Sequence, residues 1–388
     1  TAVPAANITG TLPAISGANL TGISTTPADG SITQAKLNFP VANRNLIING
    51  AMQVAQRGTS STGSATSAHY QVDRFFTFAD ATDNASFTHA QVSDAPTGFS
   101  KSFKLSVDTA ETNLASNEVL QFVQRIEAQD LQHLDNGLST AKSVTLSFYV
   151  KSYQTGVFNV NLYKPDNTAR QITATYTVNQ SATWEKKTIT FAGDTSGGGI
   201  DDDTGRGLSI YYHLAAGSDT TSSDSTSWVN YSAAGSAFGQ AVNVMSSTNN
   251  YWQITGVQLE VGSVATDFEH RSYSDEFQKC ERYYQDWKDY THAAHKGLDS
   301  SYDGHIIIDT LKINMRANPT ITGTVYGWVA DGTSWIDGSN GEAASLHNDP
   351  SSDFPGRYVK VTGVWNWNSN YQSTIAVKFV VAKFDAEL

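Results

Sequence analysis

Cysteine, positive charge and long apolar runs are scarce in this chain. Cys280 is the only cysteine among 388 residues, so no intramolecular disulfide can form. The formal net charge is −12, which argues against a surface for nucleic acid or for an anionic membrane. No apolar run reaches the length of a membrane-spanning helix, and no signal-peptide core is present. The first residue is Thr1 rather than Met, which is compatible with a longer natural chain.

Strand-forming and turn-forming residues are abundant instead. Charged residues make up only 16% of the chain, and aromatic residues make up 11%. Gly, Ser, Thr and Asn recur throughout. This mixture predicts an all-β protein with many short strands.

Residues 1–43 repeat a short aliphatic pattern that Gly and Pro interrupt. The stretch ANITG at residues 6–10 returns as ANLTG at residues 18–22. Gly and Pro rule out a regular helix here, and one extended chain could not bury the aliphatic side chains. Several copies around a common axis could bury them. We therefore expect an extended, self-associating thread, with a disordered leader as the alternative.

Alternating apolar and polar residues begin at about residue 44. The clearest runs are SFKLSV at residues 102–107, SVTLSFYVK at 143–151, VFNVNLY at 157–163, GLSIYYHL at 207–214 and YWQITGVQLEV at 251–261. In the last run the alternation slips by one residue at Thr255–Gly256, which predicts a β-bulge. About ten such strands within residues 44–270 predict one jelly-roll β-sandwich. We expect Trp184 and Trp252 to lie in its core.

Residues 271–290 break the β pattern and predict a linking helix. Four side chains share one helical stripe at positions i, i+3, i+7 and i+10: Phe277, Cys280, Tyr284 and Trp287. Ser274 is the expected N-cap, followed by the acidic residues Asp275 and Glu276. We expect the stripe to pack inward, which makes Cys280 a buried structural thiol rather than a nucleophile.

A second β domain is predicted for residues 291–388. Strands are expected near residues 305–313, 320–329, 357–367 and 373–384, with the C-terminal residues built into a sheet.

Catalytic and metal-binding motifs are few. There is no Walker glycine loop, no G-x-S-x-G and no H-E-x-x-H, and we predict no enzymatic activity. His292 and His295 form an H-x-x-H pair, but no C-x-x-C pair completes a zinc set. Asp201, Asp202 and Asp203 could supply oxygens to a structural Ca²⁺, although they lack the spacing of an EF-hand loop. A solvated acidic turn is the default interpretation of these three residues. No other cofactor is expected.

Aromatic residues near the C-terminus are the candidate ligand-binding residues. They are Trp328, Trp335, Trp365, Trp367 and Tyr371. In a strand, Trp365 and Trp367 would face the same side, and two indoles on one face can stack on a sugar ring. We place the site in the loops 328–357 and 365–373, where the aromatics are mixed with Asn, Asp and Ser. For any single Trp, a place in the core or in a subunit interface is the alternative.

Several stretches of the sequence resemble segments of a known protein family. LPAISGANLTGI and DGSITQAKL resemble the thread repeats of bacteriophage tail fibres. RNLIINGAMQVAQRGTS and YQVDRFF resemble the opening of a phage fibre domain that is similar to carbohydrate-binding jelly rolls. WEKKTITFAGDTSG and WQITGVQLEVGSVATDFEHRSYSDEFQKCERYYQ are the most specific matches, and LKINMRANPTIT resembles the start of the C-terminal domain in the same fibres.

This resemblance implies a homotrimeric fibre in the tail of a virion. Its N-terminal region would join other tail proteins, and its β domains would bind a host-surface glycan or another envelope component. Three copies of a weak site would hold by avidity. No nucleic-acid partner and no membrane insertion are expected. Two alternatives stay open: a purely structural fibre or connector that binds another virion protein, and a tailspike-like glycan depolymerase.

Overall fold

The computed structural model describes residues 43–64, 68–80, 85–287, 292–295, 315–317, 320–330, 335–337, 345–347, 360–362 and 375–388. Contacts divide the chain into residues 1–42 and residues 43–388. Residues 1–42 of the thread expected for residues 1–43 lie outside the described residues, as does the strand expected near 305–313. Within the described part, no helix has both the length and the apolar character needed to cross a membrane.

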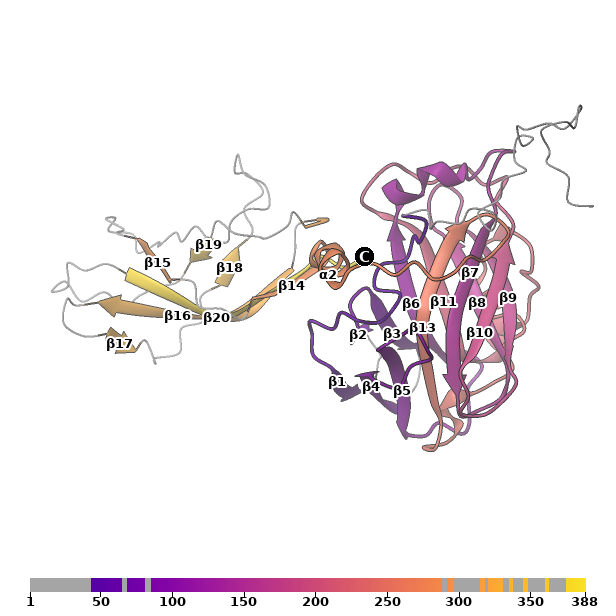
Figure 1. Cartoon of the computed structure of the whole chain (residues 1–388), viewed down its shortest axis with the longest axis horizontal. Coiled ribbons are helices and arrows are strands. Elements are labelled where there is room, and N and C mark those ends of the chain that lie inside the picture. Colours follow the sequence, from indigo (N-terminus) through magenta and orange to yellow (C-terminus); the bar gives the residue numbers. More distant parts are fainter. Residues whose placement is uncertain are drawn as a thin grey trace, which may run out of the picture. The chain divides into compact units, whose positions relative to one another are not determined.

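Two antiparallel sheets form the larger part of the second unit (Figure 1). The first sheet has the order β1-β4-β5-β13-β7-β10, with the bounds β1 Ser60–Gly63, β4 Ser86–Val92, β5 Ser102–Thr109, β13 Tyr251–Val261, β7 Val144–Ser152 and β10 Glu185–Phe191. The second has the order β12-β9-β8-β11-β6-β3-β2, with the bounds β12 Val229–Asn230, β9 Arg170–Val178, β8 Gly156–Lys164, β11 Arg206–Ala216, β6 Val119–Glu127, β3 Phe75–Asp80 and β2 His69–Tyr70.

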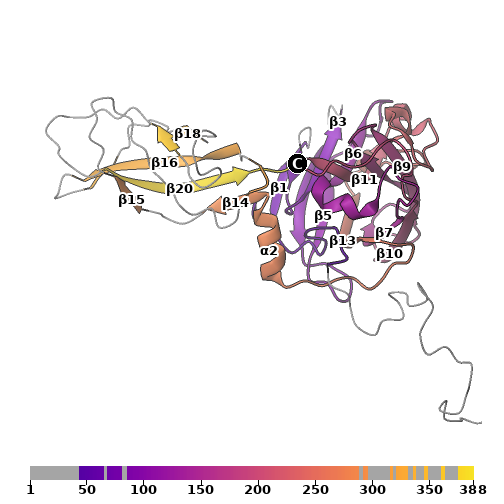
Figure 2. The same ribbon diagram turned by 90° about the horizontal axis from the view of Figure 1, so that it is seen from above.

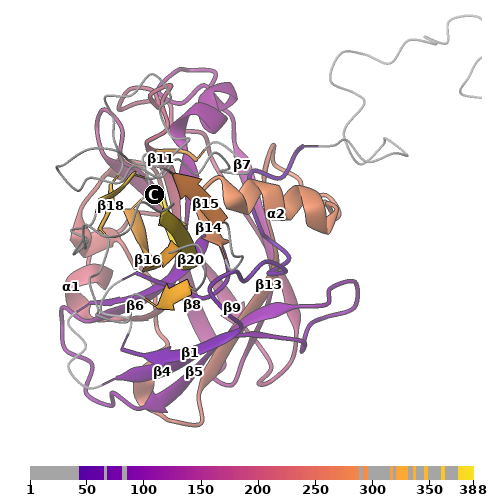
Figure 3. The same ribbon diagram turned by 90° about the vertical axis from the view of Figure 1, so that its left-hand side faces the viewer.

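The chain crosses repeatedly between these two layers. β6 belongs to the second sheet, β7 to the first, β8 and β9 to the second, and β10 to the first again. Figure 2 shows the two layers from above, and Figure 3 shows β1, β4 and β5 side by side at one end of the first sheet. The prediction of an all-β fold with a jelly-roll sandwich is confirmed.

Side-chain alternation builds the core between the sheets. In β5, Phe103, Leu105 and Val107 are buried, whereas Lys104 and Ser106 between them are partly exposed. Trp252 of β13 is fully buried, and its ring centroid lies 5.5 Å from that of Phe122 in β6. Its indole N–H donates to the Tyr176 hydroxyl at 3.3 Å, which satisfies the one polar atom that this side chain buries.

Trp184 corrects the prediction that Trp184 and Trp252 are both core residues of the sandwich. It precedes β10 and is only partly buried. Its indole N–H donates to an exposed carboxylate oxygen of Asp94 at 3.2 Å, and the Lys151 ammonium lies 6.0 Å from its ring centroid. Ile189 and Phe191 of β10 are buried, so a residue of the opposite parity faces away from the core.

The predicted β-bulge in β13 is present. The pairing of β13 with β7 shifts register between Thr255 and Gln258. Gly256 has φ +63°, a conformation that non-glycine residues rarely adopt. A Cβ atom here would lie 2.6 Å from the Phe99 ring, so both the backbone angle and the packing favour glycine.

The predicted helix is present but shorter. Helix α2 spans Tyr273–Glu281, and the next residues form β14, Tyr284–Trp287. The N-cap is Ser272 and not Ser274, because the Ser272 hydroxyl accepts from the Asp275 N–H at 3.2 Å. Cys280 is fully buried as expected, whereas Phe277 is partly exposed. The helical assignment of Tyr284 and Trp287 was wrong, because β14 pairs with β20 instead.

The C-terminal residues form a smaller antiparallel sheet. β20, Ile375–Asp385, pairs with β14, with β15, His292–His295, and with β16, Thr320–Ala330, while β17, Trp335–Asp337, pairs with β16. A separate pair consists of β18, Ser345–His347, and β19, Lys360–Thr362. The strands predicted near 320–329 and 373–384 are thus confirmed. A short helix α1, Ser218–Thr221, lies in the long connection after β11.

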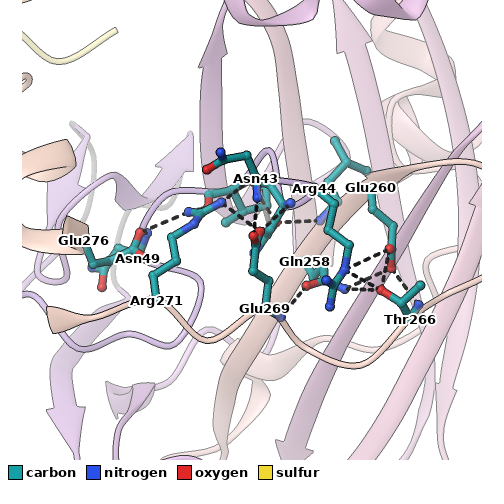
Figure 4. A network of polar contacts seen from close by, with 12 residues as sticks. Asn43, Arg44, Asn49, Gln258, Glu260, Thr266, Glu269, Arg271 and Glu276 are labelled. Carbon is teal, nitrogen blue, oxygen red and sulfur yellow. Dashed lines mark hydrogen bonds and ion pairs between the residues drawn. The ribbon is translucent and has the colours of Figure 1, made fainter. Parts of the chain in front are cut away.

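Buried ion pairs hold both ends of the described chain against the sandwich. Figure 4 shows Arg44 beside Glu260 and Thr266, and Arg271 beside Glu269 and Glu276. At the other end, Glu387 pairs with Arg74 and Arg57. The guanidinium of Arg74 also lies 3.3 Å from the centroid of the Tyr283 ring. Because these charges are largely buried, removing one partner of a pair would leave an uncompensated charge and destabilise the fold.

Candidate functional site

A groove of about 560 Å³ lies on the outer face of the seven-stranded sheet. Four neighbouring strands, β8, β11, β6 and β3, form its floor, and the connection that follows β11 forms one wall. Its volume is in the range of small-molecule sites. The lining side chains are Ala68, Phe76, Phe78, Asp80, Asn117, Val119, Gln121, Arg125, Asn161, Tyr163, Arg206, Tyr211, His213, Asp219, Thr220, Tyr231, Ala233 and Ser236.

Strand register places the floor residues in rows across the sheet. One row is Asn159, His213, Gln121 and Phe78. The next is Asn161, Tyr211, Val123 and Phe76. These positions alternate with the core residues of the same strands, so they face away from the sandwich interior.

His213 is held rigidly at the bottom of the groove. Its Nδ1 lies 3.0 Å from Asn159 Oδ1, and its Nε2 lies 3.0 Å from Gln121 Nε2. Asn159 Oδ1 can only accept, so Nδ1 carries the proton and Nε2 accepts from the Gln121 amide. Burial lowers the pKa of His213 to about 3, so the ring is neutral at physiological pH. It therefore orients Gln121 and supplies no charge to the groove.

Three tyrosines form an aromatic cluster, which we call the tyrosine wall. Tyr163 and Tyr211 belong to the strands β8 and β11, and Tyr231 follows β12. The Tyr163 ring lies 4.9 Å from that of Tyr231 and 6.4 Å from that of Tyr211, both edge to face. The Arg206 guanidinium lies 5.1 Å from the Tyr163 centroid. Tyr231 is 47% exposed, which is high for so large a side chain.

The wall that carries Tyr231 is fixed by amides from the sheet. Asn161 Nδ2 donates to the Ser236 carbonyl at 2.9 Å, and Gln171 Nε2 donates to the Ser232 carbonyl at 2.9 Å. Asn159 Nδ2 donates to the Phe238 carbonyl at 2.7 Å. Asn161 Oδ1 is buried and has no hydrogen-bond partner among the described residues. This leaves an acceptor for a donor such as a hydroxyl group.

The groove thus combines apolar rings with planar polar groups. Aromatic faces stack on the C–H face of a sugar ring, while amide and guanidinium groups bond to its hydroxyls. Two exposed carboxylates, Asp80 and Asp219, also line the groove. The Ser116 hydroxyl donates to Asp219 at 3.0 Å.

The aromatic residues predicted as ligand-binding are placed only in part. Trp328 lies in β16 and Trp335 in β17, and these strands pair through Trp328 with Asp337 and Ala330 with Trp335. Trp365, Trp367 and Tyr371 lie outside the described residues. The binding role of these five residues therefore stays a prediction.

The acidic turn lies just before β11. Asp201, Asp202 and Asp203 are all exposed, and Asp203 Oδ1 accepts from the Gly205 N–H at 2.7 Å. Among the described residues, no group of three or more His, Cys, Asp or Glu side chains is placed to hold a metal ion. Calcium at this turn stays a prediction.

The groove residues were missed because sequence reasoning looked for aromatics in loops. Tyr163 and Tyr211 occur in runs whose alternation assigns them to the outer face, opposite Leu162 and Tyr212 in the core. That alternation was the available signal. The pairing of β8 with β11, which brings these tyrosines together, is not encoded in either run alone.

No family model matches the chain, and no curated protein matches it in sequence. Among solved structures, it is similar to the enzymatically active domain of tailspike protein 4 of bacteriophage CBA120, with 15% identity and a TM-score of 0.31 over 56% of this chain. The match spans about a fifth (21%) of that tailspike domain.

Two bacterial proteins are also similar in fold. One is a putative sugar binding protein from Bacteroides thetaiotaomicron, with 13% identity and a TM-score of 0.32 over 56% of this chain and 100% of that one. The other is the C-terminal family 22 carbohydrate binding module of Clostridium thermocellum Xyn10B, with 10% identity and a TM-score of 0.29 over 58% and 100%. Identities and scores at this level carry no conclusion about the ligand of this chain.

Proposed function

We propose that this chain is a virion tail-fibre adhesin that binds a host-surface glycan in the groove on the seven-stranded sheet. One observation carries the proposal. The tyrosine wall of Tyr163, Tyr211 and Tyr231 stands beside fixed amides, and Asn161 Oδ1 has no hydrogen-bond partner among the described residues. A sugar offers both an apolar face and hydroxyl donors, so it complements this surface.

The test compares two tyrosines of equal exposure. Tyr231 of the groove and Tyr153, which follows β7 in the other sheet, are both 47% exposed. Tyr231→Ala should abolish binding on a glycan array and lower adsorption to host cells, because it removes the exposed stacking face. Tyr153→Ala should leave both unchanged. Equal binding by both variants would refute the groove as the glycan site.

The aromatics predicted in the C-terminal domain provide the competing location. The double variant Trp335→Ala, Trp367→Ala should retain glycan binding if the groove is the primary site. Loss of binding in this variant, with Tyr231→Ala unaffected, would move the site to the C-terminal domain.

An adhesin leaves the bound glycan intact, whereas a depolymerase releases shorter fragments. A glycan that the array identifies should stay intact after incubation with the protein, as measured by released reducing ends. If the protein cleaves the glycan, and Asp80→Asn or Asp219→Asn abolishes the cleavage, the protein is an enzyme rather than an adhesin. Binding to another virion protein, with no glycan bound, would favour a structural connector.

Trimer avidity is the remaining part of the proposal, and it rests on the repeats in residues 1–43. Three weak sites on one fibre would bind a cell surface far more tightly than one site. The mass of the intact chain in solution should therefore be that of a trimer. A stable monomer would contradict this part and leave the groove test unaffected.

A further inference from the structure

A second pocket, of about 420 Å³, lies away from the tyrosine wall. It is formed by residues 43–48, the end of β6, the turn that follows β6, and helix α2 with the residues after it. Its lining is Asn43, Asn45, Leu46, Ile48, Arg74, Gln124, Arg125, Ile126, Asp130, His133, Arg271, Lys279, Arg282 and Tyr283. We call it the arginine pocket.

Positive charge is concentrated in the arginine pocket, although the chain as a whole is acidic. Five lining residues are cationic, namely Arg74, Arg125, Arg271, Lys279 and Arg282, and Asp130 is the one lining carboxylate. The net charge of the whole chain is −12. Carboxylates outside the lining offset part of this charge, because they pair with three of the five cations.

Three of the arginines have carboxylate partners. Arg282 binds both carboxylate oxygens of Glu127 at 2.8 Å. Arg74 pairs with Glu387, and Arg271 pairs with Glu269 and Glu276 (Figure 4). Arg271 also donates to the carbonyl oxygens of Asn45 and Ile47. These three residues shape the pocket and hold its walls in place.

The other two cations have no ion pair with an Asp or Glu side chain in the described part of the chain. Arg125 donates to a main-chain oxygen of Leu388, the last residue of the sequence, and its guanidinium lies 4.8 Å from the centroid of the Phe76 ring. Lys279 lies on α2, is half-buried, and has no hydrogen bond or ion pair to any described residue. Burial and the nearby Arg271 lower the pKa of Lys279, and the carboxylates of Glu276, Glu269 and Asp130 oppose this shift in part. Its ammonium group is therefore partly dehydrated, with carboxylates nearby but none in direct contact.

Unpaired donors are a second, independent feature of the same pocket. The Nε–H groups of Arg74, Arg125 and Arg271 are buried and have no partner among the described residues. A buried donor without an acceptor is costly, and three of them around one pocket are unusual. These donors add to the positive potential of the pocket and favour an anionic ligand.

We propose that the arginine pocket binds a small oxyanion, a carboxylate or a phosphate, with Lys279 as a direct ligand. Such a group supplies several acceptor oxygens and a negative charge, which the paired arginines and Lys279 complement. The source is either the acidic residue of a glycan or a free phosphate. The arginine pocket shares Arg125 with the proposed glycan groove, but the tyrosine wall takes no part in it.

The experiment is calorimetric titration of the full chain in phosphate-free buffer. The probes are inorganic phosphate, glucuronate and glucose, the last having the glucuronate ring without the carboxylate. The proteins are the unmodified chain, Lys279→Gln, Lys279→Arg and Lys186→Gln. Lys186 is exposed on the first sheet, so its variant removes the same charge from another surface. A thermal unfolding curve for each variant checks that it is folded.

Phosphate or glucuronate should bind to the unmodified chain and glucose should not. Lys279→Gln should weaken binding at least about tenfold, the effect of losing one charge-assisted hydrogen bond, whereas Lys279→Arg and Lys186→Gln should retain it. Binding of phosphate alone would identify a phosphate site, and binding of glucuronate alone an acidic-sugar site. No binding of either anion, equal binding of glucose, or unchanged affinity in Lys279→Gln would each overturn the proposal.

Discussion

A single buried side chain, that of Asn49, orders the segment before the first strand. Its Nδ2 donates to the carbonyls of Val54 and Asp73, both at 2.9 Å, and its Oδ1 accepts from the Val54 N–H at 3.0 Å. Its own N–H donates to Glu276 of α2. Asn49 has φ +60°, which Asn tolerates better than most residues. Nothing in the local sequence distinguishes this asparagine from the many exposed ones.

Truncation of Trp252 should lower the stability of the sandwich much more than truncation of Trp184. Trp252 is fully buried and contacts Phe122 and Tyr212, so Trp252→Ala should cost about 3–5 kcal/mol of unfolding free energy. Trp184→Ala removes only a partly exposed ring and one hydrogen bond to an exposed carboxylate, so it should cost about 1 kcal/mol or less. Urea unfolding of both variants measures the difference. Similar losses in the two variants would contradict these assignments.

Trp184 also shows what the sequence could have revealed. Alternation back from Phe191 and Ile189 assigns Trp184 to the outer face, so the information was present. The prediction failed because aromatic character was given more weight than parity. For Trp252, aromatic character and strand parity both indicate the core, and the prediction is confirmed.

At the scale of elements, two glycines in and after β13 are needed for different reasons: one for its backbone angle and its packing, the other for its backbone angle alone. Gly256 has φ +63° and a Cβ position that clashes with Phe99, whereas Gly262 has φ +114° and open space around it. Gly262→Ala should therefore show backbone strain alone, about 1–3 kcal/mol. Gly256→Ala should cost more, because Phe99 must also move away from the sheet.

Thermal unfolding of the two glycine variants measures this difference. Gly63→Ala serves as a control, because Gly63 has no positive φ and no atom near the Cβ position. A smaller loss of stability for Gly256→Ala than for Gly262→Ala would mean that the contact with the Phe99 ring is unimportant.

The start of α2 gives a second element-scale prediction. Ser272→Ala removes the hydroxyl that accepts from Asp275 N–H and should lower stability by about 1 kcal/mol. Ser274→Ala should have little effect, because the Ser274 hydroxyl bonds only to that of Ser272 within the described residues. Chemical denaturation of both variants tests the cap. A larger loss for Ser274→Ala would restore the N-cap that the sequence predicted.

The residue at which α2 ends could not be predicted from the sequence. The stripe from Phe277 to Trp287 fits helical spacing, yet Tyr284–Trp287 pairs with β20, about a hundred residues later in the chain. The Arg57 guanidinium, 3.5 Å from the centroid of the Tyr284 ring, further holds this strand in place. Strand pairing over such a distance overrides local periodicity.

At the scale of the whole molecule, the sequence predicted the strands better than the site. Alternation identified β5, β7, β8, β11 and β13, because one buried face imposes a period of two. The groove depends on which strands are neighbours and on a long connection held by Asn159, Asn161 and Gln171. Those contacts join residues 61 to 79 positions apart, and no periodic pattern in the sequence indicates them.

Buried histidines should make the stability of the sandwich depend on pH. Burial lowers the pKa of His89 and of His213 to about 3, from a reference of 6.5. As pH falls from 6.5 toward 3, the unfolded chain binds protons at both residues and the native state does not, so stability decreases. Asp73 acts in the opposite direction, because burial raises its pKa from 3.8 to about 6. These three groups together contribute one net proton between about pH 6 and 4, or about 1.4 kcal/mol per pH unit.

His89→Phe tests this account without leaving a cavity. The His89 ring is packed among Phe87, Phe103 and His69, and neither of its nitrogens has a hydrogen-bond partner within the described residues. Phenylalanine keeps the ring and removes the two unpaired polar atoms, so the variant should be more stable than the unmodified chain at pH 7. It should also lose one of the two histidine contributions, so its stability should fall less steeply between pH 6 and 4 than that of the unmodified chain. Urea unfolding at pH 7, 6, 5 and 4 measures both effects, with the exposed His133→Gln as a control that should keep the original slope. An unchanged slope in His89→Phe would mean that His89 does not stay neutral in the folded protein.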